Sequence, residues 1–127
     1  MQALVVDDSR AMRSILTRIM SNFGFDVAQA GDGAEALALL DGGLMPDVAL
    51  VDWNMPVMDG LTFIKACRAR ADLRSITLMM VTTESEHGQI VKALAAGAHE
   101  YVIKPFTADA IGDKLALLGL LPTEVPA

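Results

Sequence analysis

The chain has 127 residues, of which 53% are hydrophobic, and a formal net charge of −6 at pH 7. This length predicts one domain with a substantial core, and an acidic balance without a basic cluster argues against binding to nucleic acid. No stretch approaches the ~20 apolar residues of a membrane span, and the first residues lack the basic and apolar segments of a signal peptide. The single cysteine, Cys67, cannot form an internal disulfide, so we expect a cytoplasmic protein that does not bind a membrane.

Short apolar runs alternate with segments of helical periodicity along the chain. The runs predict strands at 3–6, 25–28, 48–51, 76–81 and 101–103. The helical segments begin at Asp8 or Ser9, Asp32, Asp59, a capping-box pattern at 83–86, and Thr107. This alternation predicts a parallel sheet with helices on both faces, an α/β doubly wound domain. We expect the domain to occupy 1–121 and the proline-containing segment 122–127 to form a short irregular tail.

Polar residues stand where four of the apolar runs end. They are Asp7 and Asp8, Asp52, Thr82 and Lys104. The carboxyl ends of parallel strands meet at one edge of a sheet, so we expect these side chains to lie together. Each has an ordinary alternative, because the first two aspartates could cap a helix and a lone threonine or lysine could simply end a strand. For Asp52 alone, the roles of cap, metal ligand and nucleophile all remain open.

Together, these residue types suit phosphoryl transfer. Three crowded carboxylates repel one another and stay ionised only around a cation, and hard oxygen ligands that leave room for water favour Mg²⁺. A carboxylate oxygen of Asp52 could then attack phosphorus, while Lys104 and the Thr82 hydroxyl contact phosphoryl oxygens. The sequence has no glycine-rich phosphate loop, so a nucleotide is not the expected donor.

Longer strings around these residues resemble the receiver domain of two-component response regulators, from end to end of the chain. The strings are 6–9 (Val-Asp-Asp-Ser), 52–60 (Asp-Trp-Asn-Met-Pro-Val-Met-Asp-Gly), 81–84 (Val-Thr-Thr-Glu), 96–98 (Ala-Gly-Ala) and 101–106 (Tyr-Val-Ile-Lys-Pro-Phe). The resemblance implies a flavodoxin-like (βα)5 fold with strand order 2-1-3-4-5. Within the family, the Asp-Trp-Asn-Met-Pro and Lys-Pro-Phe-Thr strings and the short stretch after the last helix are most similar to the stand-alone chemotaxis regulators.

The resemblance also implies a chemical role for each residue of the site. Asp52 accepts a phosphoryl group from a histidine kinase, and Lys104, which is followed by a cis peptide bond, moves with that group. Mg²⁺ is held by Asp8, by Asp52, by the backbone carbonyl of Asn54 and, through water, by Asp7.

Two further pairs of residues receive roles from the resemblance. Thr82 and Tyr101 form a switch pair, in which the hydroxyl moves to the phosphoryl group and the ring turns inward. Asn54 and Glu84 occupy positions that tune the lifetime of the phosphoryl group and imply rapid self-dephosphorylation. Thr83 departs from the alanine that is common in the family, which leaves that lifetime open.

The implied partners follow from the chemotaxis regulators. They are a histidine kinase of the chemotaxis type, the flagellar motor switch protein or another protein target, and a phosphatase, with the chain itself a monomer. The target would bind the fourth helix, fifth strand and fifth helix, where Tyr101, Lys92 and Lys114 lie. For the two lysines, simple solvation is the alternative.

Three functions compete at this point. The first is a phosphorylation-activated switch that binds a protein target and catalyses only its own phosphorylation and dephosphorylation. The second is a phosphorelay shuttle or phosphate sink that has no contact with a motor. The third is a Mg²⁺-dependent phosphohydrolase of the haloacid-dehalogenase type, which is disfavoured because Asn54 stands where those enzymes carry a second aspartate.

Overall fold

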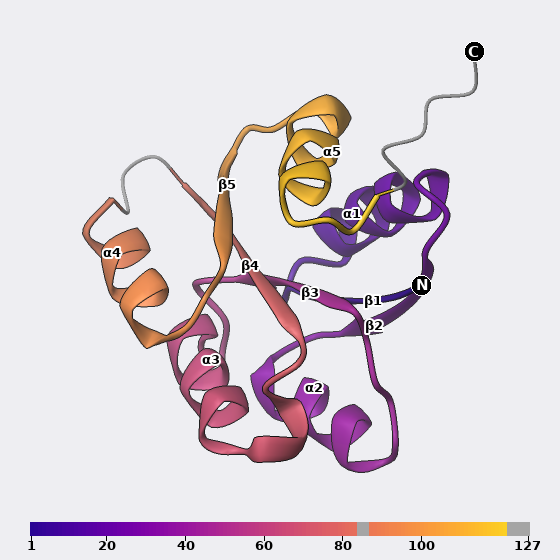
Figure 1. The fold of residues 1–127 in the computed structure, drawn as a ribbon. Coiled ribbons are helices and arrows are strands. Elements are labelled where there is room, and N and C mark those ends of the chain that lie inside the picture. Colours follow the sequence, from indigo (N-terminus) through magenta and orange to yellow (C-terminus); the bar gives the residue numbers. More distant parts are fainter. Residues whose placement is uncertain (84–86, 122–127) are drawn as a thin grey trace.

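The computed structural model describes residues 1–83 and 87–121, in which the strands form one parallel sheet in the order β2-β1-β3-β4-β5 (Figure 1). The strands are β1 (Gln2–Val6), β2 (Asp26–Ala30), β3 (Val48–Asp52), β4 (Thr77–Thr83) and β5 (Glu100–Lys104). The helices are α1 (Arg10–Asn22), α2 (Gly33–Asp41), α3 (Gly60–Ala69), the short 3-10 helix η1 (Ala71–Leu73), α4 (His87–Ala96) and α5 (Ala108–Leu117). The predicted doubly wound α/β fold and its strand order are confirmed.

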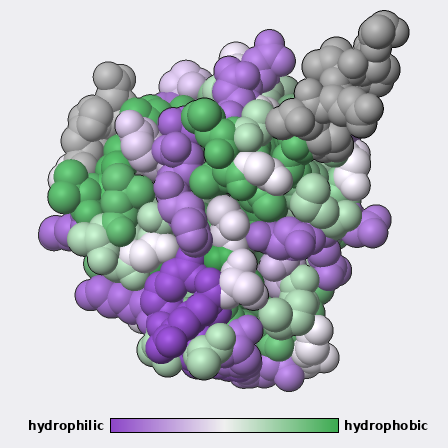
Figure 2. Space-filling view, in the orientation of Figure 1, coloured by the Kyte–Doolittle hydropathy of each residue, from purple (hydrophilic) through white to green (hydrophobic). Residues whose placement is uncertain are grey.

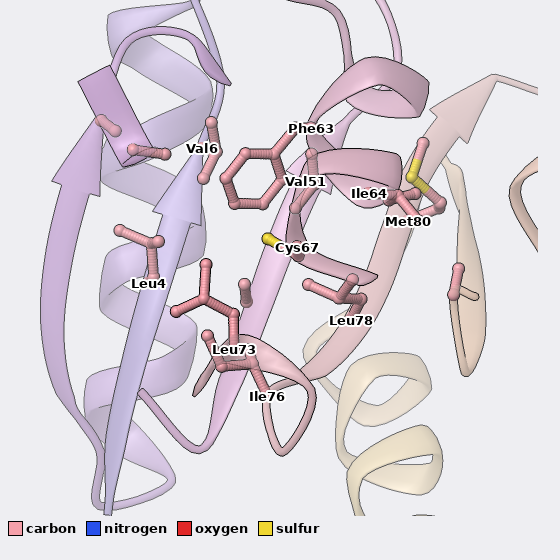
Figure 3. Packing of buried hydrophobic residues seen from close by; sticks show 14 of the residues in the cluster. Leu4, Val6, Val51, Phe63, Ile64, Cys67, Leu73, Ile76, Leu78 and Met80 are labelled. Atoms are coloured by element: carbon pink, nitrogen blue, oxygen red, sulfur yellow. The ribbon is translucent and has the colours of Figure 1, made fainter. Parts of the chain in front are cut away.

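Two apolar layers enclose the sheet, one on each face. On one face, residues such as Leu4 and Val51 pack against α2, α3 and α4, and Figure 3 shows Phe63 of α3 pointing into this cluster. On the other face, Val5 and Leu50 pack against α1 and α5. Successive strand residues point to opposite faces, so the central strands must be apolar at nearly every position. All five residues of β3 are buried, which fixes its last residue, an aspartate, at a covered edge of the sheet.

The helix starts follow the caps that the sequence predicts. Ser9 Oγ accepts a hydrogen bond from Met12 N at 3.2 Å, so Ser9 rather than Asp8 caps α1. The side chains of Asp32, Asp59 and Thr107 accept the corresponding bonds at the starts of α2, α3 and α5. Each such cap stabilises its helix by about 1 kcal/mol. Because a serine caps α1, the Asp8 carboxylate remains available for another role.

The structure differs from the prediction at several boundaries. Strand β4 runs through Thr83 instead of ending at Val81, because its pairing with β5 extends to Thr83 opposite Lys104. The capping-box pattern of the fourth helix falls mainly on 84–86, outside the described residues. On α4, Ile90 is buried, whereas Val91 is exposed, so only part of the apolar sequence of this helix faces the core.

Exposed apolar side chains therefore gather over α4, on the left side of Figure 2. Val91 is 68% exposed and Leu94 is 41% exposed. Within residues 1–83 and 87–121, no helix is both long enough and apolar enough to cross a membrane.

Candidate functional site

Three carboxylates meet at the carboxyl edge of the sheet. Asp7 follows β1 directly, Asp8 comes next, and Asp52 is the last residue of β3. Strands β1 and β3 are neighbours with Val6 opposite Val51, so their ends place Asp7 beside Asp52. One oxygen from each of the three carboxylates lies within 4.8 Å of the others. The structure therefore brings together the acidic residues that the sequence singled out.

Lys104 reaches this cluster from the edge strand β5. Its Nζ donates a hydrogen bond to Asp52 Oδ1 at 3.1 Å and lies 3.7 Å from Asp7 Oδ2. Strand β4, which lies between β3 and β5, contributes Thr82, which is buried. The peptide bond between Lys104 and Pro105 is cis, as the resemblance implies. An ammonium from β5 thus meets a carboxylate from β3, and β4 between these strands carries the buried Thr82.

Burial raises the proton affinity of two of the carboxylates. The pKa of Asp52 is raised from 3.8 to about 6, mainly because burial disfavours its charged form and then because Asp7 repels it, with the Lys104 hydrogen bond opposing both effects. Burial also raises the pKa of Asp7, against the hydrogen bond that its Oδ1 accepts from Ser9 N at 2.8 Å. Raised carboxyl pKa values in a shared cluster are typical of functional sites.

The donor set fits a hard divalent cation. Among the described residues, Asp7 Oδ2 is buried and accepts no hydrogen bond, although Lys104 Nζ lies near it. An unsatisfied buried carboxylate oxygen costs free energy unless a cation or donor approaches it. Three carboxylates, one of them on the exposed Asp8, offer oxygen ligands with access to water, which is the environment that Mg²⁺ prefers.

The backbone around Asp52 is held by a glycine. Gly60, the first residue of α3, donates from its N–H to Trp53 O at 2.9 Å, so the loop after β3 folds back on the strand end. A Cβ on Gly60 would lie 2.5 Å from Asp52 O, closer than any side chain can approach. The loop between them contains Val57 with a φ of 66°, a left-handed conformation that is costly for a β-branched residue.

One residue near the cluster was missed by the sequence analysis. Arg13 Nη1 donates to Asp7 O at 2.6 Å, and its charge opposes the raised pKa of Asp7. Its position could have been predicted from helical spacing, because Arg13 lies three and seven residues before Leu16 and Met20, the buried residues of α1. This spacing places Arg13 on the same side of the helix as those two residues. A charged residue on an otherwise buried helical stripe needs a specific partner, and here that partner is the site's own backbone.

The residues predicted to form the partner surface separate into two places. Tyr101 of β5 and Lys114 of α5 lie together, with Lys114 Nζ 4.9 Å from the centroid of the Tyr101 ring. They line a hollow of about 370 Å³ with residues that include Pro105 and Phe106. Lys92 lies instead in a second hollow between α3 and α4, beside Leu61, Lys65, Ala95 and Ala96. Glu84 lies outside the described residues.

Comparison with known proteins assigns the domain. The sequence model for the response regulator receiver domain matches residues 3–116. The chain belongs to this family. The receiver is 40% identical over 119 residues to chemotaxis protein CheY1 of Helicobacter pylori, an alignment that covers 93% of this chain and 96% of that relative. It is also 40% identical over 116 residues to chemotaxis protein CheY of Pseudomonas aeruginosa, covering 91% of this chain and 93% of the relative.

Solved structures agree with this assignment. The receiver superimposes on the chemotaxis response regulator CheY4 of Vibrio cholerae with a TM-score of 0.84 at 33% identity, covering 92% of this chain and 97% of that chain. The receiver is therefore a domain of phosphorylation-activated signalling with CheY-like relatives, and it carries an acidic cluster at the expected edge of its sheet.

Proposed function

We propose that this chain is a response regulator receiver whose Asp52 accepts a phosphoryl group from a histidine kinase. The observation that carries the proposal is the convergence of Asp7, Asp8 and Asp52 on one position, with Lys104 Nζ 3.1 Å from Asp52 Oδ1. In the transfer, the P–N bond of the kinase phosphohistidine breaks as a P–O bond to Asp52 forms, and the electron pair leaves with the imidazole nitrogen. The receiver domain is proposed to span 1–121.

Each neighbouring side chain has a defined part in this transfer. Bound Mg²⁺, held by Asp8, Asp52 and the Asn54 carbonyl and, through water, by Asp7, would offset negative charge on the carboxylates and on the phosphoryl group. The Lys104 ammonium and the Thr82 hydroxyl donate hydrogen bonds to phosphoryl oxygens, because phosphoryl transfer depends on positioning and charge neutralisation more than on acid–base catalysis. Asn54 and Glu84 influence how quickly water removes the group again.

The signal leaves the site through Thr82 and Tyr101. When the Thr82 hydroxyl turns toward the phosphoryl group, the Tyr101 ring moves inward into the space that becomes available. Tyr101 is half-buried on the edge strand, where a change in ring position alters the surface formed by α4, β5 and α5. We propose that this surface binds the protein target, with Lys92 and Lys114 at its borders.

The phosphoacceptor is tested with a small phosphodonor. Incubation with Mg²⁺ and radiolabelled acetyl phosphate should label the protein, and Asp52→Asn should abolish the label. The matched control is Asp26→Asn, which changes an exposed aspartate at the start of β2 and should leave labelling unchanged. Persistent labelling of the Asp52→Asn protein refutes this assignment.

The metal site is tested through the only tryptophan of the chain. Trp53 is buried next to Asp52, so Mg²⁺ binding should quench its fluorescence. Asp8→Ala should weaken the Mg²⁺ titration at least tenfold, since a direct carboxylate ligand is lost. An unchanged titration would place the cation elsewhere.

The target is proposed to be the flagellar motor switch, in line with the names of the chemotaxis relatives. Capture of the receiver by purified motor switch protein should require acetyl phosphate, Mg²⁺ and an intact Asp52. Absence of capture in both states, with Asp52 labelled normally, would favour a phosphate sink or phosphorelay shuttle. A phosphatase partner, a cytoplasmic location and a monomeric state remain predictions from the sequence.

A further inference from the structure

Lys114 is held in place by two different contacts. Its Nζ lies 3.1 Å from Glu100 Oε1 and 4.9 Å from the centroid of the Tyr101 ring. The same Glu100 oxygen also accepts a hydrogen bond from Tyr101 N at 3.0 Å. One carboxylate oxygen therefore binds both the lysine above the ring and the backbone that carries the ring.

Because of the position of β5 in the sheet, Lys114 can contact the Tyr101 ring in only one of the two ring positions. Strand β5 lies at the edge of the sheet, and Tyr101 packs on the face covered by α4, whereas Lys114 comes from α5 on the opposite face. Lys114 therefore reaches over the free edge of the strand to meet the ring. A ring that turns away from this edge loses the ammonium, because cation–π attraction falls off beyond about 6 Å.

We propose that Lys114 and Glu100 form a latch that holds the Tyr101 ring beside the Lys114 ammonium, a ring position that we call outer, in the unphosphorylated protein. This inference deepens the proposed function, because it rests on Tyr101 as a switch residue, and it makes Lys114 and Glu100 positioning residues. An interaction made in only one of two states shifts the equilibrium between them by its full free energy. The ammonium therefore disfavours the inward ring until phosphorylation of Asp52 supplies a larger opposing contribution.

The size of the effect follows from the chemistry of the contact. Cation–π contacts near the surface are worth enough to change a two-state ratio by about two- to fivefold. Side chains of Lys114 and Glu100 are 30% and 21% exposed, so both are partly withdrawn from water and the pair is less screened than a fully exposed one. Loss of the latch should thus raise the inward fraction measurably without disturbing the acidic cluster.

The experiment uses the single tyrosine of the chain. Replacing it with 3-fluorotyrosine gives one ¹⁹F resonance, which reports the ring position of Tyr101 alone. The unphosphorylated and acetyl phosphate-treated wild-type proteins, both with Mg²⁺, define the outer and switched positions. Lys114→Gln removes the charge, Lys114→Arg keeps it, and Glu100→Gln removes the anchor. Lys65→Gln on the exposed surface of α3 is the control, and thermal melts verify that each variant folds.

The latch predicts a specific pattern in the unphosphorylated proteins. Lys114→Gln should move the resonance toward the switched position, with a ratio of inward to outer ring about two- to fivefold higher. Glu100→Gln should move it less in the same direction, and Lys114→Arg and Lys65→Gln should match wild type. A Lys114→Gln resonance equal to that of wild type overturns the latch, as does a wild-type resonance that stays still although Asp52 is labelled. An unlabelled Asp52 would refute the proposed function instead, and the comparison of Lys114→Gln with wild type would still decide whether the ammonium holds the ring.

Discussion

Lys104 Nζ lies 3.1 Å from Asp52 Oδ1, although strand β4 separates the two strands that carry these residues. The long side chain of Lys104 spans that strand and ends between two carboxylates, since Asp7 Oδ2 is 3.7 Å away. The ammonium is therefore the protein's own counter-charge at a position where a divalent cation would also bind. The ammonium and Mg²⁺ therefore compete for the same carboxylates, so loss of the ammonium should affect Mg²⁺ binding and phosphorylation in opposite directions.

Lys104→Gln should tighten Mg²⁺ binding and slow phosphorylation. Removal of one positive charge near the cation favours Mg²⁺ by about 1 kcal/mol, or roughly fivefold in Kd. The same variant loses a donor to the phosphoryl group, so the initial rate of labelling by acetyl phosphate should fall at least tenfold. Both are measured by Trp53 fluorescence and by radiolabel at pH 8.5, which is well above the pKa of about 6 of Asp52. Lys65→Gln is the control, and weaker Mg²⁺ binding by Lys104→Gln would contradict the competition.

Asp52→Asn should stabilise the protein in the absence of Mg²⁺. The pKa of Asp52 is about 6 in the folded protein against an ordinary 3.8, so the folded state binds this proton more tightly than the unfolded chain. The free energy of unfolding therefore falls as the pH rises from 3.8 to about 6. At pH 7.5 the buried, ionised carboxylate destabilises the folded state. Urea denaturation at pH 7.5 should give a free energy of unfolding higher by about 1–3 kcal/mol for Asp52→Asn. Asp26→Asn should change it little, and a destabilised Asp52→Asn would show that the Lys104 pair outweighs burial.

Gly60→Ala should damage both the fold and the site. The new Cβ would lie 2.5 Å from Asp52 O and 3.1 Å from Trp53 Cα, so the strand end or the start of α3 must shift. We expect a loss of about 1–3 kcal/mol in the free energy of unfolding and slower labelling of Asp52. Gly88→Ala is the matched control, because a Cβ at this position in α4 meets no atom within 4 Å. That change should stabilise the helix by up to ~1 kcal/mol, and equal effects of the two substitutions would argue against the close contact.

His99 should make stability sensitive to acid. Its Nδ1 lies 3.2 Å from Leu78 N, from which it accepts a hydrogen bond, and 3.2 Å from Arg68 Nη2. Burial, and then the Arg68 charge, lower the pKa of His99 below its ordinary 6.5. The folded state therefore binds this proton less tightly than the unfolded chain, so the stabilisation is complete above about pH 6.5 and is lost as the pH falls below it.

The pH dependence of thermal melts measures this contribution. His99→Gln, which keeps a hydrogen-bond acceptor without a titrating group, should show a smaller loss of stability between pH 7 and pH 5 than wild type. His87→Gln serves as the histidine control. If wild type and His99→Gln lose stability in parallel over this range, His99 does not contribute.

Much of this protein follows from local patterns in the sequence. Strand and helix type follow from the spacing of apolar residues, and the caps at Ser9 and Asp32 follow from the need of a helix start for hydrogen-bond acceptors. The grouping of Asp7, Asp52 and Lys104 follows from the rule that parallel strands end at one edge. The strand order did not follow from these patterns and rested on family resemblance.

Only the tertiary structure decided contacts that depend on register and on the reach of long side chains. The pairing of β4 with β5 extends the strand through Thr82 and Thr83, although the apolar run of the sequence ends at Val81. Arg13 donates a hydrogen bond to the backbone carbonyl of Asp7, and the Lys114 ammonium lies over the Tyr101 ring. Such contacts form between segments far apart in the chain or around a helical turn, so apolar periodicity alone does not encode them. The sequence by itself determined which chemical groups stand at the strand ends, and the fold decided which of them touch.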